Sequence, residues 1–184
     1  AQTAAAAYAA TRAGGIDARI IAAALNTFPG LPHRLERVAT VEGVRFINDS
    51  KATNANAAAQ ALAVYPRVYW IAGGVAKEGG IAELAPFFPR MANAYLIGQS
   101  AGEFADALKD KVAVTMAGNL EAATKLAFAD ARASGEPHPV VLLSPACASF
   151  EQGRSYEERG DKFKAYVAAL QDAPANGARA GGKA

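Results

Sequence analysis

The fold is decided by the stretch Val44-Arg45-Phe46-Ile47-Asn48-Asp49-Ser50-Lys51-Ala52-Thr53-Asn54. Its first residues are β-branched and aromatic, which predicts a short strand. A sharp exit follows, and the alanine-rich run from Ala55 to Tyr65 predicts a helix. A carboxylate, two hydroxyls and a lysine therefore stand between a strand and a helix, where α/β sheets bind ligands and helix N–H groups favour anions. A capped strand–helix loop with a solvated lysine has the same spacing, so both interpretations stay open.

Beyond this stretch, short apolar runs alternate with helical segments. Predicted strands cover 68–72, 94–97, 112–115 and 140–144, and predicted helices cover 54–65, 80–90, 100–109, 119–133 and 156–171. Short, continuously apolar strands suit a sheet that is covered on both faces, and their alternation with helices implies right-handed βαβ crossovers. The expected fold class is therefore α/β, a three-layer, doubly wound, mostly parallel sheet.

Two helices and a hairpin are predicted ahead of the alternating region. The helices are expected over 2–13 and 17–25, and the paired strands over 37–41 and 44–48. Gly14-Gly15 separates the helices, Asp17 is a candidate cap for the second, and Glu42-Gly43 is a turn pair suited to a β-hairpin. The chain has no initiator methionine and starts as though inside a helix, so we interpret it as part of a longer protein.

Composition excludes several classes of function. The net charge is +2, and the two cations Arg179 and Lys183 lie in the Ala-, Gly- and Pro-rich segment 173–184, which we expect to be disordered. Without that segment the charges balance, so no nucleic-acid partner is expected. No apolar run reaches membrane length, so no membrane insertion is expected. The single cysteine, Cys147, excludes an internal disulfide and a cysteine-based metal cage, and fits a reducing cytoplasm.

The loops after the other predicted strands carry further polar groups. Gly73-Gly74-Val75-Ala76-Lys77 could turn tightly and reach an anion, although by itself the segment is better explained as a glycine turn with a surface lysine. In 145–150, small residues allow close backbone approach, and Ser149 offers a hydroxyl. Cys147 is better explained as a small buried thiol than as a nucleophile. Tyr156, at the start of the last helix, either covers a ligand or fastens the helix to the sheet.

Taken together, five segments resemble those of the Mur ligases, in the family's order and spacing over residues 1–171. They are 30–34, 48–54, 73–74 with Lys77, 144–149 and 158–163. Asp-Ser-Lys-Ala-Thr-Asn and Ser-Pro-Ala-Cys-Ala-Ser resemble most the branch of the family that adds D-glutamate.

The resemblance implies a place within a three-domain protein. Residues 1–34 would be the end of a central ATPase domain, and residues 35–172 a C-terminal, amino-acid-binding, Rossmann-like domain. In the family reaction, ATP converts the carboxylate of UDP-N-acetylmuramoyl-L-alanine to an acyl phosphate. The amine of D-glutamate then attacks, and amide, ADP and phosphate result, as a cytoplasmic step of peptidoglycan precursor synthesis. The P-loop and the Mg²⁺ ligands would lie in the absent part of the central domain, so this chain is expected to hold no metal and to be inactive by itself.

The resemblance also assigns roles by position. Lys51 would be catalytic, beside the transferring phosphate, because a fixed cation stabilises the charge that develops there. The positions that hold ATP are Thr3, His33, Arg34, Asp49 and Lys51, and those of the D-glutamate pocket are Thr53, Lys77, Ser149, Phe150 and Tyr156. Thr3 stands where the family usually has asparagine, which puts the adenine contact in doubt. Tyr156 replaces the usual phenylalanine and adds a hydroxyl that needs a partner.

Two alternatives stay open from sequence. One is a sister amide ligase, either another Mur ligase or a folylpolyglutamate-type enzyme, with a different amino acid. The other is a non-catalytic Rossmann-like binding module.

Overall fold

A computed structural model describes residues 2–76, 79–149 and 154–172, and the chain divides into two compact units, residues 1–31 and 32–184. The first unit is a pair of helices, α1 (Gln2–Ala13) and α2 (Ala18–Thr27). Asp17 caps α2 as predicted, since its carboxylate accepts a hydrogen bond of 2.8 Å from the Arg19 N–H. Within the described residues, no helix has the length and apolarity needed to cross a bilayer.

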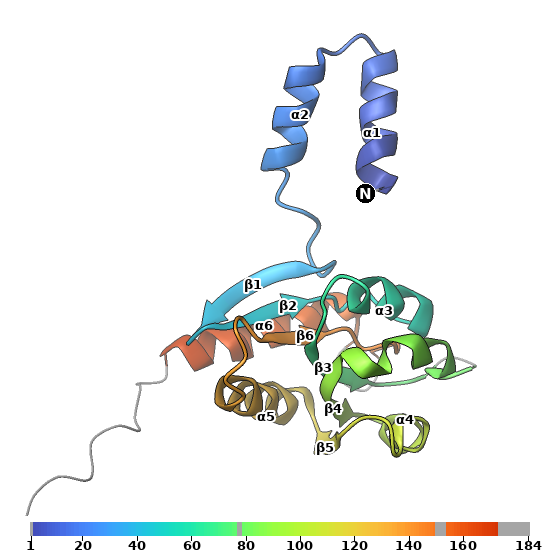
Figure 1. Cartoon of the computed structure of the whole chain (residues 1–184), viewed down its shortest axis with the longest axis vertical. Helices are drawn as coiled ribbons and strands as arrows, with labels where there is room; N and C mark the ends of the chain where they lie inside the picture. The colour runs from blue at the N-terminus through green and yellow to red at the C-terminus, as the bar shows by residue number, and fades with distance from the viewer. Residues whose placement is uncertain (1, 77–78, 150–153, 173–184) are drawn as a thin grey trace, which may run out of the picture. The chain divides into compact units, whose positions relative to one another are not determined.

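The second unit is built on a six-stranded sheet (Figure 1). Its strands are β1 (Glu36–Val41), β2 (Val44–Asn48), β3 (Val68–Gly73), β4 (Met91–Ile97), β5 (Val114–Gly118) and β6 (Val140–Leu143). The order across the sheet is β1-β2-β6-β3-β4-β5, and only β1 runs antiparallel to its neighbour. β3 and β6 are wholly buried, which explains their continuous apolar sequences, and β2 is buried at four of its five residues.

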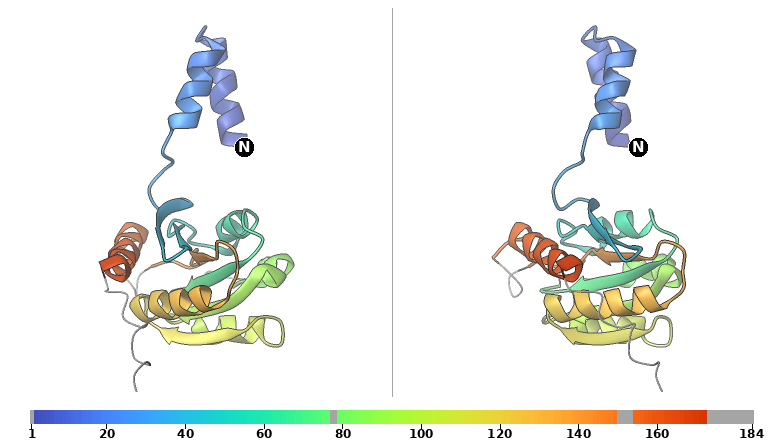
Figure 2. Two further views of the ribbon diagram at one scale, coloured as in Figure 1. Left: turned by 60° about the vertical axis from the view of Figure 1, so that its left-hand side comes forward. Right: turned by 90° about the vertical axis from the view of Figure 1, so that its left-hand side faces the viewer.

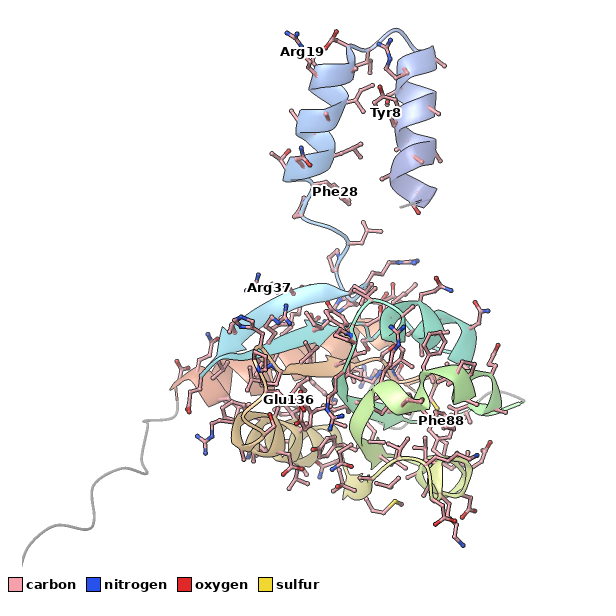
Figure 3. The ribbon with its side chains drawn as sticks, in the orientation of Figure 1. Tyr8, Arg19, Phe28, Arg37, Phe88 and Glu136 are labelled. Carbon is pink, nitrogen blue, oxygen red and sulfur yellow. The ribbon has the colours of Figure 1, made fainter. Side chains whose placement is uncertain are left out.

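Helices cover both faces of this sheet (Figure 2). The elements are α3 (Ala55–Leu62), the 3₁₀ helix η1 (Ala82–Arg90), α4 (Ala101–Leu108), α5 (Leu120–Ala133) and α6 (Tyr156–Asp172). One core forms between the sheet and α3, η1 and α4, where Phe88 (Figure 3) packs with Trp70 and Phe104. The other forms between the sheet and α5 and α6, around Phe46 and Phe163. The predicted three-layer α/β fold, with a mostly parallel sheet, is confirmed.

Most predicted elements are present, with three adjustments. The helix predicted over 80–90 is a 3₁₀ helix over Ala82–Arg90 rather than an α-helix, because Pro86 and Pro89 lack the N–H groups that an α-helix needs. β4 begins at Met91, three residues before the predicted strand, and β5 lies at 114–118 rather than 112–115. The hairpin is confirmed, and Glu42 and Gly43 at its turn both have positive φ, 45° and 84°.

Candidate functional site

The loops that follow β2, β3 and β6 meet at the carboxyl end of the parallel strands. The Asp49 N–H donates to the carbonyl of Leu143 over 2.7 Å, and the Gly73 N–H donates to Pro145 over 2.9 Å. Val75 and Ala148 form an isolated antiparallel bridge between two of the loops. We call residues 48–53, 73–76 and 144–149, together with the first turns of α6, the carboxyl edge.

Two glycines allow the second of these loops to pass close to its neighbours. Gly73 and Gly74 have φ of 121° and 134°, which L side chains rarely adopt. A Cβ at Gly73 would collide with the carbonyl of Ile97, and one at Gly74 with the carbonyl of Ala148. The paired glycines therefore serve the tight turn that was predicted from sequence.

Lys51 stands at the centre of the carboxyl edge. Its N–H donates to the His33 carbonyl over 3.0 Å, and its own carbonyl accepts from the Thr53 N–H over 2.9 Å, so its backbone is held on both sides. Its ammonium lies 3.7 Å from the centroid of the Tyr156 ring. Among the described residues, no carboxylate forms an ion pair with this ammonium, which leaves it able to meet an anionic ligand.

Asp49 is a buried carboxyl beside Lys51. It is 7 % exposed, and its oxygens accept hydrogen bonds from the Ser144 hydroxyl at 2.8 Å and the Leu35 N–H at 3.1 Å. Burial raises its pKa to about 6, although these hydrogen bonds and the charge of Arg34 act in the opposite direction. The pKa of Asp49 is therefore set by the balance between its burial and the donors and charges around it.

Arg159 fastens α6 to two of the loops. Its side chain is fully buried, and its guanidinium donates to the Ser50 hydroxyl (2.9 Å), the Ser50 carbonyl (2.8 Å) and the Cys147 carbonyl (3.1 Å). Burial lowers its pKa to about 10, so it stays charged at neutral pH. The Ser50 hydroxyl in turn donates to the Tyr156 carbonyl over 2.8 Å. These bonds join the residue before Lys51 directly to the start of α6.

His33 is buried against residues 48–53, which we call the lysine loop. Its Nδ1 lies 3.0 Å from the Asn48 side-chain amide, and its ring meets the Tyr156 ring edge-on at 6.0 Å between centroids. Gly160 makes room for it, since a Cβ there would collide with Nδ1 of His33. His33 has a φ of 61°, uncommon for a residue with a side chain, so the loop places this ring at the site against its backbone preference.

Six of the predicted site residues lie in the carboxyl edge or pack against it. His33, Asp49, Lys51 and Tyr156 are linked as described, Thr53 is half-buried in the lysine loop, and Ser149 is buried at the end of the 144–149 loop. Arg34 is exposed next to His33, and its charge acts on Asp49. Thr3 lies exposed on α1, in the other unit. Lys77 and Phe150, like the segment 173–184, lie outside the described residues.

The described residues near the carboxyl edge include the cationic side chains of Arg34 and Lys51, which could bind an anion. Among them, no three His, Cys, Asp or Glu side chains converge as metal ligands. Cys147 is buried as predicted, with its Sγ 3.2 Å from the Ser100 hydroxyl, and His138 is exposed as predicted. A nucleotide would find cations at Arg34 and Lys51 and a hydroxyl acceptor at Asp49.

Arg159 had no predicted role, although a signal for it exists. Arg159, Gly160, Phe163 and Val167 are the buried residues of α6 and follow a helical spacing of three and four. That spacing places Arg159 on the same face as Phe163. A charged residue in line with apolar ones is the pattern that could have identified a buried guanidinium.

Comparison with known proteins identifies the family. Residues 33–147 match the family model described as "Mur ligase, glutamate ligase domain", which is more than half of the chain. The chain belongs to the Mur ligase family. The matched segment begins at His33 and ends at Cys147, so it contains the lysine loop and most of the 144–149 loop that meet at the carboxyl edge.

Several Mur ligases are similar over nearly the whole chain. A UDP-N-acetylmuramoylalanine–D-glutamate ligase from Phenylobacterium zucineum is 55% identical over 96% of this chain, which covers 38% of that relative. Proteins of the same name from Rhodospirillum rubrum and Rhizobium etli are 59% and 55% identical over 92% of the chain, which covers 35% and 36% of them. The chain thus spans little more than a third of the length of these curated relatives.

Proposed function

We propose that this chain is the amino-acid-binding portion of an ATP-dependent ligase that joins D-glutamate to UDP-N-acetylmuramoyl-L-alanine. The observation that carries the proposal is the carboxyl edge, where Lys51, whose ammonium has no ion pair among the residues that the structure describes, lies in one loop with Asp49 and Thr53 and is hydrogen-bonded to His33. The names of the similar proteins support D-glutamate as the amino acid and the alanine-bearing UDP-sugar as its acceptor. Residues 1–31 would then belong to a central ATPase domain, and the protein would act in the cytoplasm.

The reaction needs cations, which Lys51 in the carboxyl edge and Arg34 ahead of β1 would supply. Phosphoryl transfer to a carboxylate spreads negative charge over the phosphate oxygens, which a fixed cation stabilises. Lys51 would fill this role, Arg34 would contact the ATP phosphates, and Asp49 would accept hydrogen bonds from the ribose hydroxyls. ATP supplies the phosphoryl group, and Mg²⁺ would be held by residues outside this chain.

The amino-acid pocket would be formed by the second set of side chains. A dicarboxylate needs a cation and neutral donors, which Lys77, Thr53 and Ser149 would provide, while Phe150 and Tyr156 would line its stem. Ser149 is buried and follows Ala148, which forms a β-bridge with Val75 in the loop 73–76 that precedes Lys77. The bridge supports the idea that these two loops act on one ligand.

The test is amino-acid turnover by the full-length ligase that contains this chain. With ATP and UDP-N-acetylmuramoyl-L-alanine present, we expect ADP release with D-glutamate and at least about a hundredfold less with L-alanine, L-lysine or diaminopimelate. Preference for one of the other amino acids would indicate a sister ligase, and no turnover with any would favour a binding module. Lys77→Ala should raise the KM for D-glutamate, and unchanged kinetics would contradict its assignment.

A further inference from the structure

The ammonium of Lys51 has an unusual partner for a lysine in a polar site. It lies 3.7 Å from the centroid of the Tyr156 ring, and it forms no ion pair with a carboxylate of the described residues. A cation over an aromatic face is held only weakly. A buried carboxylate would hold it more firmly and would compete with a phosphate for the same charge.

The contact between Lys51 and Tyr156 is built into the backbone on both sides. Ser50, which precedes the lysine, donates its hydroxyl to the carbonyl of Tyr156 itself, and the Arg159 guanidinium grips the Ser50 carbonyl. The lysine backbone is fixed by the carbonyl of His33, whose ring meets the edge of the same tyrosine. These hydrogen bonds fix the backbone on both sides of the contact, so the ring and the ammonium are positioned by the fold as well as by their own attraction.

The hydroxyl and the ring of Tyr156 act on different neighbours. Glu157 is fully exposed, and its pKa is lowered chiefly by a hydrogen bond with the Tyr156 side chain and only weakly by the charge of Lys51. The hydroxyl thus acts on an exposed carboxylate, while the aromatic face lies against the ammonium. Removing the hydroxyl and removing the ring are consequently different experiments.

We infer that the aromatic face of Tyr156 is a positioning group for Lys51: it holds the ammonium beside the phosphate site and releases it when a phosphate oxygen arrives. This inference rests on the proposed function of Lys51 and adds a second role to Tyr156, which otherwise would only line the amino-acid pocket. The role belongs to the first half of the reaction, before the amine of the amino acid takes part. Tyr156 touches no reacting atom in this role, so its effect passes through Lys51.

Isotope exchange in the full-length ligase separates the two roles, because it is measured without D-glutamate. The readout is scrambling of ¹⁸O between the β,γ-bridge and non-bridge positions of ATP in the presence of UDP-N-acetylmuramoyl-L-alanine. We expect Tyr156→Leu to slow the exchange about fivefold, which corresponds to about 1 kcal/mol. Tyr156→Phe, which retains the ring, should restore most of that rate. Tyr166→Leu, ten residues further along α6, is the matched control and should leave exchange unchanged.

A raised KM for D-glutamate with normal exchange in Tyr156→Leu would overturn the inference, since it would leave only the pocket role. Loss of exchange in Tyr156→Phe equal to that in Tyr156→Leu would overturn it as well. If the wild-type ligase shows neither exchange nor turnover, the proposed function fails instead.

The geometry can also be tested in this chain without any activity. The ε-methylene protons of Lys51 lie next to the face of Tyr156, so their NMR signals should be shifted upfield by the ring current. This shift should persist in Tyr156→Phe and disappear in Tyr156→Leu, at an unchanged thermal unfolding midpoint. An ε-methylene signal that stays at the same position in Tyr156→Leu would overturn the inference directly.

Discussion

At the carboxyl end of the parallel strands, Asn48, Asp49 and Ser144 are buried and hydrogen-bonded. At the amino end, Arg67 and His138 are exposed, and Arg45 and Glu136 are half-buried. There a groove of about 430 Å³ is lined by residues that include Arg45, Arg67, Glu136 (labelled in Figure 3) and His138. Arg67 and Glu136 form an ion pair of 2.6 Å, with the arginine side chain 54 % exposed. One sheet thus has two polar edges of different construction.

The difference in burial between the two ends of the sheet indicates which end holds the functional site. Burying a polar group costs free energy unless each of its hydrogen bonds is made, so a protein seldom gathers such groups without a reason. The carboxyl edge gathers them around one lysine that forms no ion pair with the described carboxylates. At the amino end, which we call the amino edge (residues 66–67 and 136–140 with Arg45), the ion pair of Arg67 and Glu136 is exposed to water and contributes little to stability. The predictions below test this contrast, from the largest expected effect to the smallest.

Lys51→Ala should have the largest effect. In the full-length ligase we expect ADP release to fall at least about a hundredfold, because the variant removes the cation that would stabilise the transferring phosphate. The thermal unfolding midpoint should change little, since the side chain is only partly buried. Arg67→Ala at the amino edge should retain the wild-type rate. A Lys51→Ala rate within tenfold of wild type would remove the contrast between the edges.

Arg159→Met should destabilise the fold most. It leaves the carbonyls of Ser50 and Cys147 without the donors that satisfy them, and we expect a loss of about 3 kcal/mol in the free energy of unfolding. Denaturant unfolding of this chain measures it. Arg159→Lys should recover only part of the loss, because one ammonium cannot donate to both loops in the geometry of a guanidinium. Full recovery by lysine would show that charge alone matters at this position.

Asp49→Asn should change how stability depends on pH. Burial raises the pKa of Asp49 from 3.8 to about 6, so the folded state binds a proton more tightly than the unfolded state does. Its contribution to stability is therefore present at low pH and is lost as pH rises from about 4 to 6, by up to about 3 kcal/mol. The wild-type protein should lose this amount relative to Asp49→Asn between pH 4 and pH 7. Parallel pH profiles of unfolding free energy would contradict the raised pKa.

Arg67→Met should have the smallest effect. Its ion pair with Glu136 is short but exposed to water, so we expect a loss below about 1 kcal/mol. Raising the ionic strength should shrink the difference from wild type further. A loss as large as that of Arg159→Met would show that the amino edge is built like the carboxyl edge.

Local chemistry made much of this fold predictable from sequence. Asp17 precedes a helix and caps it, Glu42-Gly43 joins two alternating runs and forms a hairpin turn, and the alternation of apolar runs with helices indicated the covered sheet. Each of these depends on neighbours within a few residues. The 3₁₀ helix at 82–90 differed because two prolines outweigh an otherwise helical pattern.

The interior of the site was harder to predict, because its partners are far apart in the chain. Arg159 and Ser50 are separated by 109 residues, and the helical spacing that places Arg159 on the buried face of α6 does not indicate which loop its guanidinium contacts. Family resemblance identified Lys51, Asp49 and His33, whose side chains the structure brings to one edge. It did not indicate that Lys51 lies on Tyr156, which depends on the angle at which α6 meets the sheet. The roles in catalysis and binding stay predictions.

The grip of Arg159 on Ser50 has a consequence for how the protein is made. A ribosome adds about 5 to 20 residues per second, and Arg159 follows Ser50 by 109 residues. Arg159 is therefore synthesised about 5 to 20 s after the loop that contains Ser50. β2 meets its partner β6 only after a similar delay, since those strands are joined across most of the domain. Until then the loop that carries Lys51 lacks its contacts with the last helix, and a message truncated ahead of that helix would yield a protein without the hydrogen bonds between Ser50 and α6.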